Sequence, residues 1–246
     1  MRRLFLLICF AFPVATNGDQ PNMGLDLSVY SRYVWRGIVY DEGAVLQPDF
    51  WIQARGITMT FWGSLDVKDE NGDHLWQFNE WDTFLDVTMG GYGPVWFGGG
   101  LYYNSFPASS GEGLSTAEVA AWASGDVAGS PTIIVYWDIW ALHGVYVNFN
   151  LSQDVDIGPG NLALSAGVGW GDDRHNLWSG VEDAGGWLDL QADVEYSIFV
   201  SSLLTLTPAL HFSSMLQDEI RDYYDKEGID PTSLFFSLGV SLAVSP

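Results

Sequence analysis

The few positive charges of this chain raise the first chemical question. In the stretch GLDLSVYSRYVWRGI, residues 24–38, the alternation of an extended chain places Arg32 and Arg36 on the same side as Asp26. The acidic residues that share this polar side in their own predicted strands are Asp26, Asp66, Glu80, Asp82, Asp86, Glu118, Asp138, Asp189, Asp193 and Glu195. The arginines either pair with neighbouring carboxylates or create, with them, a field that selects charged solutes.

A second candidate for chemistry is the sequence His211-Phe212-Ser213. A strand places His211 and Ser213 on one face, where the imidazole could deprotonate the hydroxyl, as in outer-membrane phospholipases and lipid A deacylases. Ser214 stands where those enzymes have asparagine, and the alternation turns His211 away from the apolar face that a lipid substrate would contact. A hydrolase that uses His211 and Ser213 is therefore the alternative function.

Metal ligands are sparse. The segment DVKDENGDH, residues 66–74, gathers carboxylates around a glycine, but the glycine follows Asp69 too closely for an EF-hand loop. The four histidines, at positions 74, 143, 175 and 211, lack the spacing of zinc ligands. We predict no metal site and no cofactor.

The elements that must position these residues are strands. Apolar and polar residues alternate in ITMTFWGSLDV (57–67), VYVNFNLS (145–152) and WLDLQADVEY (187–196), and no convincing amphipathic helix is present. We predict twelve strands, at residues 24–37, 46–54, 57–67, 77–89, 94–105, 115–125, 131–139, 143–154, 161–171, 186–197, 203–213 and 233–244.

The predicted connections alternate in length. Residues 38–45, 68–76, 106–114, 172–185 and 214–232 form long connections, whereas those near Ala54, Gly91, Val127, Pro159 and Val200 are short. Outer-membrane barrels show this asymmetry between extracellular loops and periplasmic turns. The link around Leu142 is the exception, because its place in the series calls for a long loop and it is short.

The apolar face decides between a membrane barrel and a soluble all-β protein. Its aromatic residues gather near the long connections, as an interfacial girdle requires: Tyr33, Trp35, Trp81, Tyr103, Trp170, Phe212 and Phe236. Phe97 and Tyr196 mark a thinner girdle near the short turns. Strands of about 10 residues also match a tilted membrane crossing. We therefore predict an all-β, transmembrane, up-and-down antiparallel β-barrel, with a soluble all-β protein as the alternative.

Composition and the first residues limit the possible partners. Residues 1–20 have two arginines, an apolar run and then small residues, which predicts a signal peptide before a barrel domain at residues 21–246. Its removal takes away Arg2, Arg3 and Asp19 and changes the net charge from −22 to −23, and so acidic a protein is a poor nucleic-acid partner. Aromatics at 15% and charged residues at 16% favour a folded chain over an acidic disordered one.

The first three predicted strands resemble the opening of the TorF-like family of porins. That family has an aromatic-x-Arg-Gly motif, a glutamine at the start of the second strand and a Gly-aromatic-Trp pattern on the third. The matching residues are Tyr33, Trp35, Arg36, Gly37, Gln47, Gly56, Phe61, Trp62 and Gly63. The resemblance implies an outer-membrane barrel with a transport role, and it names no substrate.

Together these patterns predict a bacterial outer-membrane porin without catalytic activity. It would be a narrow channel for passive diffusion of cations or small solutes, surrounded by outer-membrane lipid, in which Arg32, Arg36 and the lumen carboxylates tune selectivity. Bulky residues are expected on the lumen side as well: Tyr30, Trp62, Phe84, Trp122, Tyr136, Tyr146 and Trp187. If they fill the lumen, the chain is a closed structural barrel instead.

Overall fold

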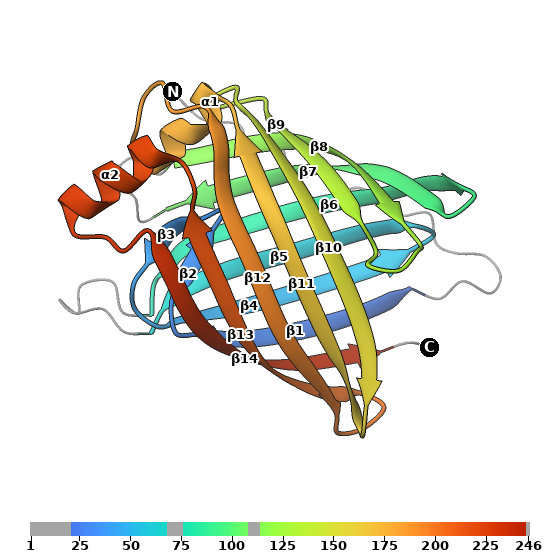
Figure 1. The fold of residues 1–246 in the computed structure, drawn as a ribbon. Coiled ribbons are helices and arrows are strands. Elements are labelled where there is room, and N and C mark those ends of the chain that lie inside the picture. Colours follow the sequence, from blue (N-terminus) through green and yellow to red (C-terminus); the bar gives the residue numbers. More distant parts are fainter. Residues whose placement is uncertain (1–20, 68–75, 108–113, 245–246) are drawn as a thin grey trace, which may run out of the picture.

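The protein folds as a closed antiparallel barrel of twelve strands (Figure 1). The structure, a computed structural model, describes residues 21–67, 76–107 and 114–244, so the predicted signal peptide lies outside the described residues. The barrel strands are β1 (Asn22–Tyr30), β4 (Val45–Ala54), β5 (Ile57–Asp66), β6 (Phe78–Tyr92), β7 (Val95–Phe106), β8 (Leu114–Gly125), β9 (Thr132–Asp138), β10 (Val145–Ile157), β11 (Gly160–Gly171), β12 (Gly186–Phe199), β13 (Leu204–Met215) and β14 (Thr232–Val244). Each pairs with its neighbour along the chain, and β14 closes the barrel on β1. The predicted fold class is confirmed.

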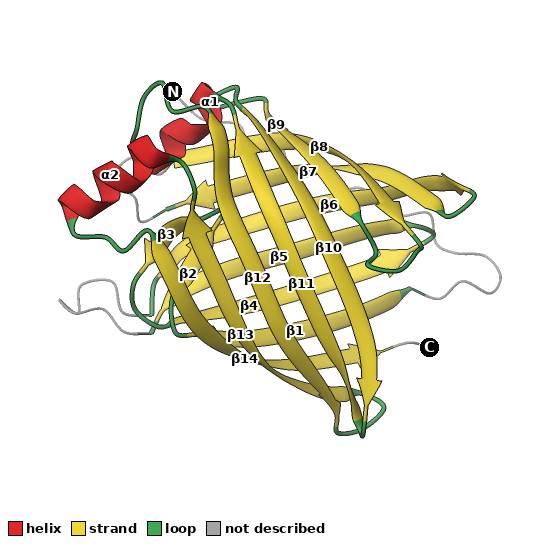
Figure 2. Ribbon diagram, in the orientation of Figure 1, coloured by secondary structure: helices red, strands yellow, loops and turns green. Residues whose placement is uncertain are grey.

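The long and short connections lie at opposite ends of the barrel. In the described part of the chain, the long-connection end carries the helical segments α1 (Asp173–Asn176), η1 (Leu177–Ser179, a 3₁₀ helix) and α2 (Asp218–Glu227) (Figure 2). The link between β9 and β10, which the sequence marks as the exception to the alternation of lengths, is a short turn held by the Asp138 side chain. The Asp138 carboxylate accepts the backbone N–H groups of Trp140 and Ala141, each at 2.9 Å, and of Leu142 at 3.3 Å.

The outer face of the barrel is apolar, as alternation predicts. On β1, Leu25, Leu27 and Val29 are 43–50% exposed, while Asp26 and Tyr30, on the other side of the strand, point to the lumen and are half-buried. Trp81, Trp170 and Phe236 of the predicted girdle are also exposed. Within the described residues, no helix is long and apolar enough to cross a membrane.

The prediction of one strand over residues 24–37 is wrong beyond Tyr30. The chain leaves the barrel wall there and forms a separate hairpin, β2 (Tyr33–Trp35) and β3 (Ile38–Asp41), in which Trp35 pairs with Ile38. The two turn residues, Arg36 and Gly37, both have positive φ, 50° and 79°. A two-residue turn of this kind suits a right-twisted hairpin, and glycine adopts it without steric cost. Tyr33 and Trp35 therefore belong to this hairpin and not to the outer girdle.

A small apolar core covers the long-connection end. Ile220 and Tyr224, one turn apart on α2, are buried with Ile38 of the hairpin, Leu188 and Met215. Burial raises the pKa of the Tyr224 hydroxyl to about 12. Each fully buried aliphatic side chain contributes roughly 1.5–3 kcal/mol. This apolar cluster therefore fixes α2 and the hairpin to each other.

A β-bulge supplies one member of this cluster. The register of β11 and β12 shifts between Gly169 and Trp170, so that Gly169 pairs with Asp189 but Trp170 pairs with Trp187. The extra residue, Leu188, is completely buried, and Trp187 is 60% exposed. The expectation that Trp187 projects into the lumen is therefore wrong, because strict alternation does not continue through a bulge.

Candidate functional site

The turn of the β2–β3 hairpin is anchored by an ion pair inside the barrel. Arg36 donates two hydrogen bonds to the Glu118 carboxylate on β8, Nη1 to Oε1 at 2.8 Å and Nη2 to Oε2 at 2.9 Å. The two residues are only 6% and 3% exposed. The Arg36 Cζ atom also lies 4.1 Å from the Trp35 ring centroid and 4.4 Å from those of Tyr136 and Tyr146. Bidentate geometry and three aromatic rings thus hold one cation in place.

Two further carboxylates fix the hairpin on its other sides. The Tyr33 hydroxyl donates to Glu80 on β6 at 2.7 Å. Asp189 on β12 accepts a hydrogen bond from the Tyr146 hydroxyl at 3.0 Å. Asp189 also packs against Gly37: a side chain at position 37 would place its Cβ only 2.7 Å from the Asp189 Cβ. The hairpin is therefore packed against strands from different parts of the barrel wall.

Arg32 takes a different position from the predicted one. It lies in the connection between β1 and β2, and its Nη1 donates to the Ser233 hydroxyl on β14 at 2.9 Å. Neither arginine is carried by a strand of the barrel wall, which corrects the sequence prediction. The sequence did hold a signal for this, because an Arg-Gly pair between apolar residues is compatible with a tight turn.

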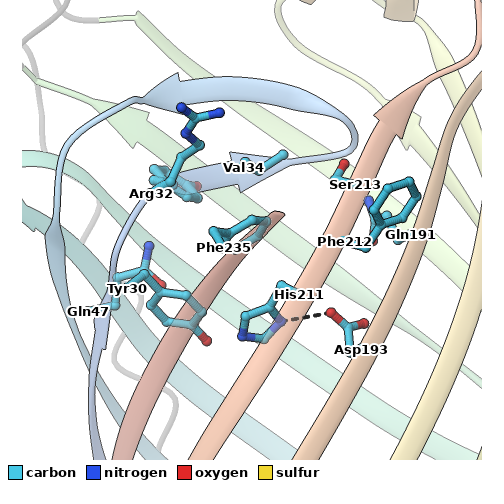
Figure 3. A pocket seen from close by; sticks show the side chains of 11 residues that line it. Tyr30, Arg32, Val34, Gln47, Gln191, Asp193, His211, Phe212, Ser213 and Phe235 are labelled. Atoms are coloured by element: carbon cyan, nitrogen blue, oxygen red, sulfur yellow. Dashed lines mark hydrogen bonds and ion pairs between the residues drawn. The ribbon is translucent and has the colours of Figure 1, made fainter. Parts of the chain in front are cut away.

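The hairpin separates two cavities in the lumen. The larger, of about 400 Å³, is lined by Arg36, Glu118 and Asp82 together with tyrosines such as Tyr102. The smaller, of about 200 Å³, is lined by residues of β1, β12, β13 and β14 (Figure 3). Val34 of the hairpin and Gln191 of β12 line both cavities. The hairpin and Gln191 therefore form the boundary between them.

The predicted lumen carboxylates fall into groups with different partners. Glu80, Asp82, Glu118 and Asp189 surround the hairpin and are buried. Asp86 accepts from the Tyr102 hydroxyl, and Asp26 from Trp51 Nε1 at 3.0 Å. Asp66, Asp193 and Glu195 also lie on the lumen side: Asp66 accepts from Asn79 Nδ2, Asp193 lines the smaller cavity and Glu195 is half-buried. Asp138, in contrast, stabilises the β9–β10 turn, where its carboxylate accepts hydrogen bonds from backbone N–H groups.

One lumen carboxylate was missed. Asp49 on β4 lies directly opposite Asp26 in the β1–β4 register, which brings two acidic residues together near the middle of both strands. Alternation within the predicted strand 46–54 would have placed it on the polar side. Among the described residues, no group of three or more His, Cys, Asp or Glu side chains is arranged to hold a metal ion.

A buried histidine lies beside the ion pair. Asp172 caps α1 by accepting the His175 backbone N–H at 2.8 Å, and this turn directs the His175 ring toward Tyr146, with 4.9 Å between ring centroids. His175 is only 1% exposed. Burial, together with the nearby Arg36 guanidinium, holds its pKa well below 6.5, so the ring is neutral at pH 7.

The predicted pairing of His211 with Ser213 is not formed. His211 points into the lumen, as expected, but its Nδ1 contacts Asp193 Oδ1 at 2.8 Å and its Nε2 contacts Ser237 Oγ at 2.9 Å. The Ser213 hydroxyl is buried and has no hydrogen-bond partner among the described residues. Ser237 lies on the adjacent strand β14, which spacing along one strand could not reveal.

Comparison with known proteins gives similar barrels at low identity. An outer-membrane channel of Pseudomonas putida F1 is similar over 93% of this chain and 97% of its own, with 9% identity and a TM-score of 0.49. Vibrio cholerae OmpT is similar over 94% of this chain and 99% of its own, with 5% identity and a TM-score of 0.41. Salmonella typhi OmpF is similar over 92% of this chain and 98% of its own, with 8% identity and a TM-score of 0.40. No protein-family model and no curated protein sequence matches the chain. Identities and TM-scores this low support no argument about function, and the TorF-like resemblance stays a prediction.

Proposed function

We propose that this protein is a porin of the bacterial outer membrane, a narrow channel for passive diffusion of cations or small solutes. The observation that carries the proposal is the pair of lumen cavities on either side of a hairpin, within a closed barrel whose outer face is apolar. Exposed leucine, valine and aromatic side chains around the wall would contact membrane lipid.

The charge of the lumen favours cations. Asp82, Glu118 and Arg36 line the larger cavity, and the Arg36 charge is neutralised by Glu118 in the bidentate pair. The remaining carboxylates, among them Asp26, Asp86 and Glu195, leave an acidic passage with low-dielectric walls, which concentrates cations and excludes anions. In this proposal, the hairpin is the constriction that limits solute size.

The test is conductance of the purified, folded protein in planar bilayers under a KCl gradient. We expect single-channel steps with a reversal potential on the cation-selective side. Folding is checked by heat-modifiable electrophoretic mobility of the same sample. Equal permeability to K⁺ and Cl⁻ would refute the selectivity, and folded protein without conductance would refute the channel.

A closed structural barrel is the second candidate, and the apolar cluster at the long-connection end supports it. Tyr40 of β3 stacks on Phe106 at 5.8 Å and 10°, and Phe106 contacts Trp178 of η1 at 5.8 Å. With α2, these rings cover the hairpin from the loop side. In the channel proposal this cover must have a path through it or move, so absence of conductance would favour the closed barrel.

A further inference from the structure

A chain of hydrogen bonds crosses four neighbouring strands on the lumen side of the barrel. The Ser165 hydroxyl on β11 donates to Asp193 Oδ2 on β12 at 3.0 Å. Asp193 Oδ1 lies 2.8 Å from His211 Nδ1 on β13, and His211 Nε2 lies 2.9 Å from Ser237 Oγ on β14. Asp193 and His211 are directly opposite each other in the register, so the barrel wall itself sets their separation.

The order of atoms in this chain is that of a serine hydrolase. A carboxylate at Nδ1 fixes the imidazole tautomer that carries its proton on Nδ1, and Nε2 then presents a lone pair to the serine hydroxyl. We propose that Asp193, His211 and Ser237 form a catalytic triad that hydrolyses small carboxylic esters inside the lumen. This activity is separate from the proposed channel function.

The smaller cavity is the place for the substrate. His211 and Asp193 line it, as do Phe235 and Tyr30, whose ring centroids lie 4.9 Å and 5.4 Å from that of His211 (Figure 3). Ser237 is 7% exposed and adjoins the cavity through its contact with His211 Nε2, so the substrate reaches its hydroxyl past the His211 ring. The cavity volume of about 200 Å³ is below that of pockets for drug-sized ligands, which are about 300–1,000 Å³. The cavity therefore suits short-chain esters, with the aromatic rings against the acyl chain.

The reaction uses one water and needs no other reagent. Ser237 Oγ attacks the ester carbonyl carbon while its proton passes to His211 Nε2, and Asp193 stabilises the resulting imidazolium. Tyr30 lies opposite Ser237 in the β1–β14 register, and the two side chains share a hydrogen bond. In this proposal the Tyr30 hydroxyl donates to the oxyanion once Ser237 has become acylated. The C–O bond to the alcohol then breaks, and the alcohol leaves with the proton from Nε2. Water, deprotonated by His211 Nε2, attacks the carbonyl carbon of the acyl-serine. The C–O bond to Ser237 then breaks, Ser237 Oγ takes the proton from Nε2, and the carboxylic acid leaves.

Ser213 cannot take the place of Ser237 in this geometry. It lies on the same strand and the same face as His211, but both ring nitrogens of His211 already have partners on other strands. The two serines therefore give the proposal a sharp test, since a reagent specific for activated serine hydroxyls should distinguish them.

The experiment is labelling of the detergent-purified full-length protein with a fluorophosphonate, followed by peptide mapping, together with turnover of p-nitrophenyl acetate. We expect one label, on Ser237. Ser237→Ala should lose label and turnover, and Asp193→Asn should lower turnover by roughly 10³–10⁴-fold. Ser241→Ala is the matched control, because Ser241 lies on the same strand with the same alternation and should keep both.

Each other outcome would overturn the proposal. No label on folded wild-type protein, or a label on Ser213, excludes Ser237 as nucleophile. Turnover that survives in Ser237→Ala excludes the triad as its source. Peptide mapping of the wild-type protein decides the nucleophile even if a variant fails to fold, and heat-modifiable mobility identifies such a failure.

Discussion

The Arg36–Glu118 pair is expected to be the main anchor of the hairpin, which a double-mutant cycle can measure. Arg36→Met leaves the Glu118 carboxylate buried at 3% exposure without its two charge-assisted hydrogen bonds. Glu118→Met leaves the guanidinium buried at 6% exposure against the rings of Trp35, Tyr136 and Tyr146, without its bidentate partner. Removing one member of a buried pair costs about 3–5 kcal/mol, because the other charge is left uncompensated.

The double variant Arg36→Met/Glu118→Met removes both charges and should be destabilised by less than either single variant. The three rings around position 36 accept a methionine side chain well, and the desolvation cost of two ions disappears. We therefore expect the double variant to be more stable than the sum of the single changes predicts, by about 3 kcal/mol or more.

The assay is guanidinium unfolding of each variant in the same detergent, followed by tryptophan fluorescence, with reversibility checked from both directions. Glu42→Met is the matched control, since Glu42 is an exposed carboxylate of the same connection and its loss should change stability by no more than about 0.5 kcal/mol. Effects that add to within about 0.5 kcal/mol would refute the reasoning, because they would show that water screens the pair.

Three further changes test other parts of the structure by guanidinium unfolding, in detergent for the first and third and in lipid bilayers for the second. Gly37→Ala should lower the free energy of unfolding by at least about 1 kcal/mol, because φ is 79° and the new Cβ would lie 2.7 Å from the Asp189 Cβ. An unchanged unfolding midpoint would show that position 37 does not adopt this turn conformation. Leu27→Lys places a charge on the outer face of β1 and should cost about 2–4 kcal/mol near the membrane midplane, measured in lipid bilayers, whereas no cost would mean that this face does not contact lipid. The pKa of His175 is lowered in the folded protein, so the unfolded chain binds the proton first and the free energy of unfolding falls as pH decreases below 6.5. Relative to His175→Leu, the wild-type protein should lose up to about 1.4 kcal/mol per pH unit. The same pH dependence in both proteins would show that folding does not lower the pKa of His175.

From the sequence, only the side of its own strand on which each residue of the candidate site lies could be predicted. The side of each wall strand that faces the lumen follows from alternation, and the carboxylates at positions 26, 86, 118 and 193 lie on that side. Their role in selectivity stays a prediction. Alternation cannot show that a chain leaves the wall, however, and the same pattern that marks β1 continues through Tyr33 and Trp35 into the hairpin. The positive φ values at Arg36 and Gly37 then reverse the chain between β2 and β3, and this turn is held by contacts with strands distant in sequence.

By itself, the sequence determined the barrel and its two sides, because side chains of a strand alternate with a period of two and connections of alternating length separate the strands. Only the tertiary structure decided which side chains meet across strands. Glu118 is 82 positions from Arg36, and Ser237 is 26 positions from His211. Such pairs depend on barrel register and on the inward fold of the hairpin, and these arise from the packing of the whole molecule and not from any local pattern.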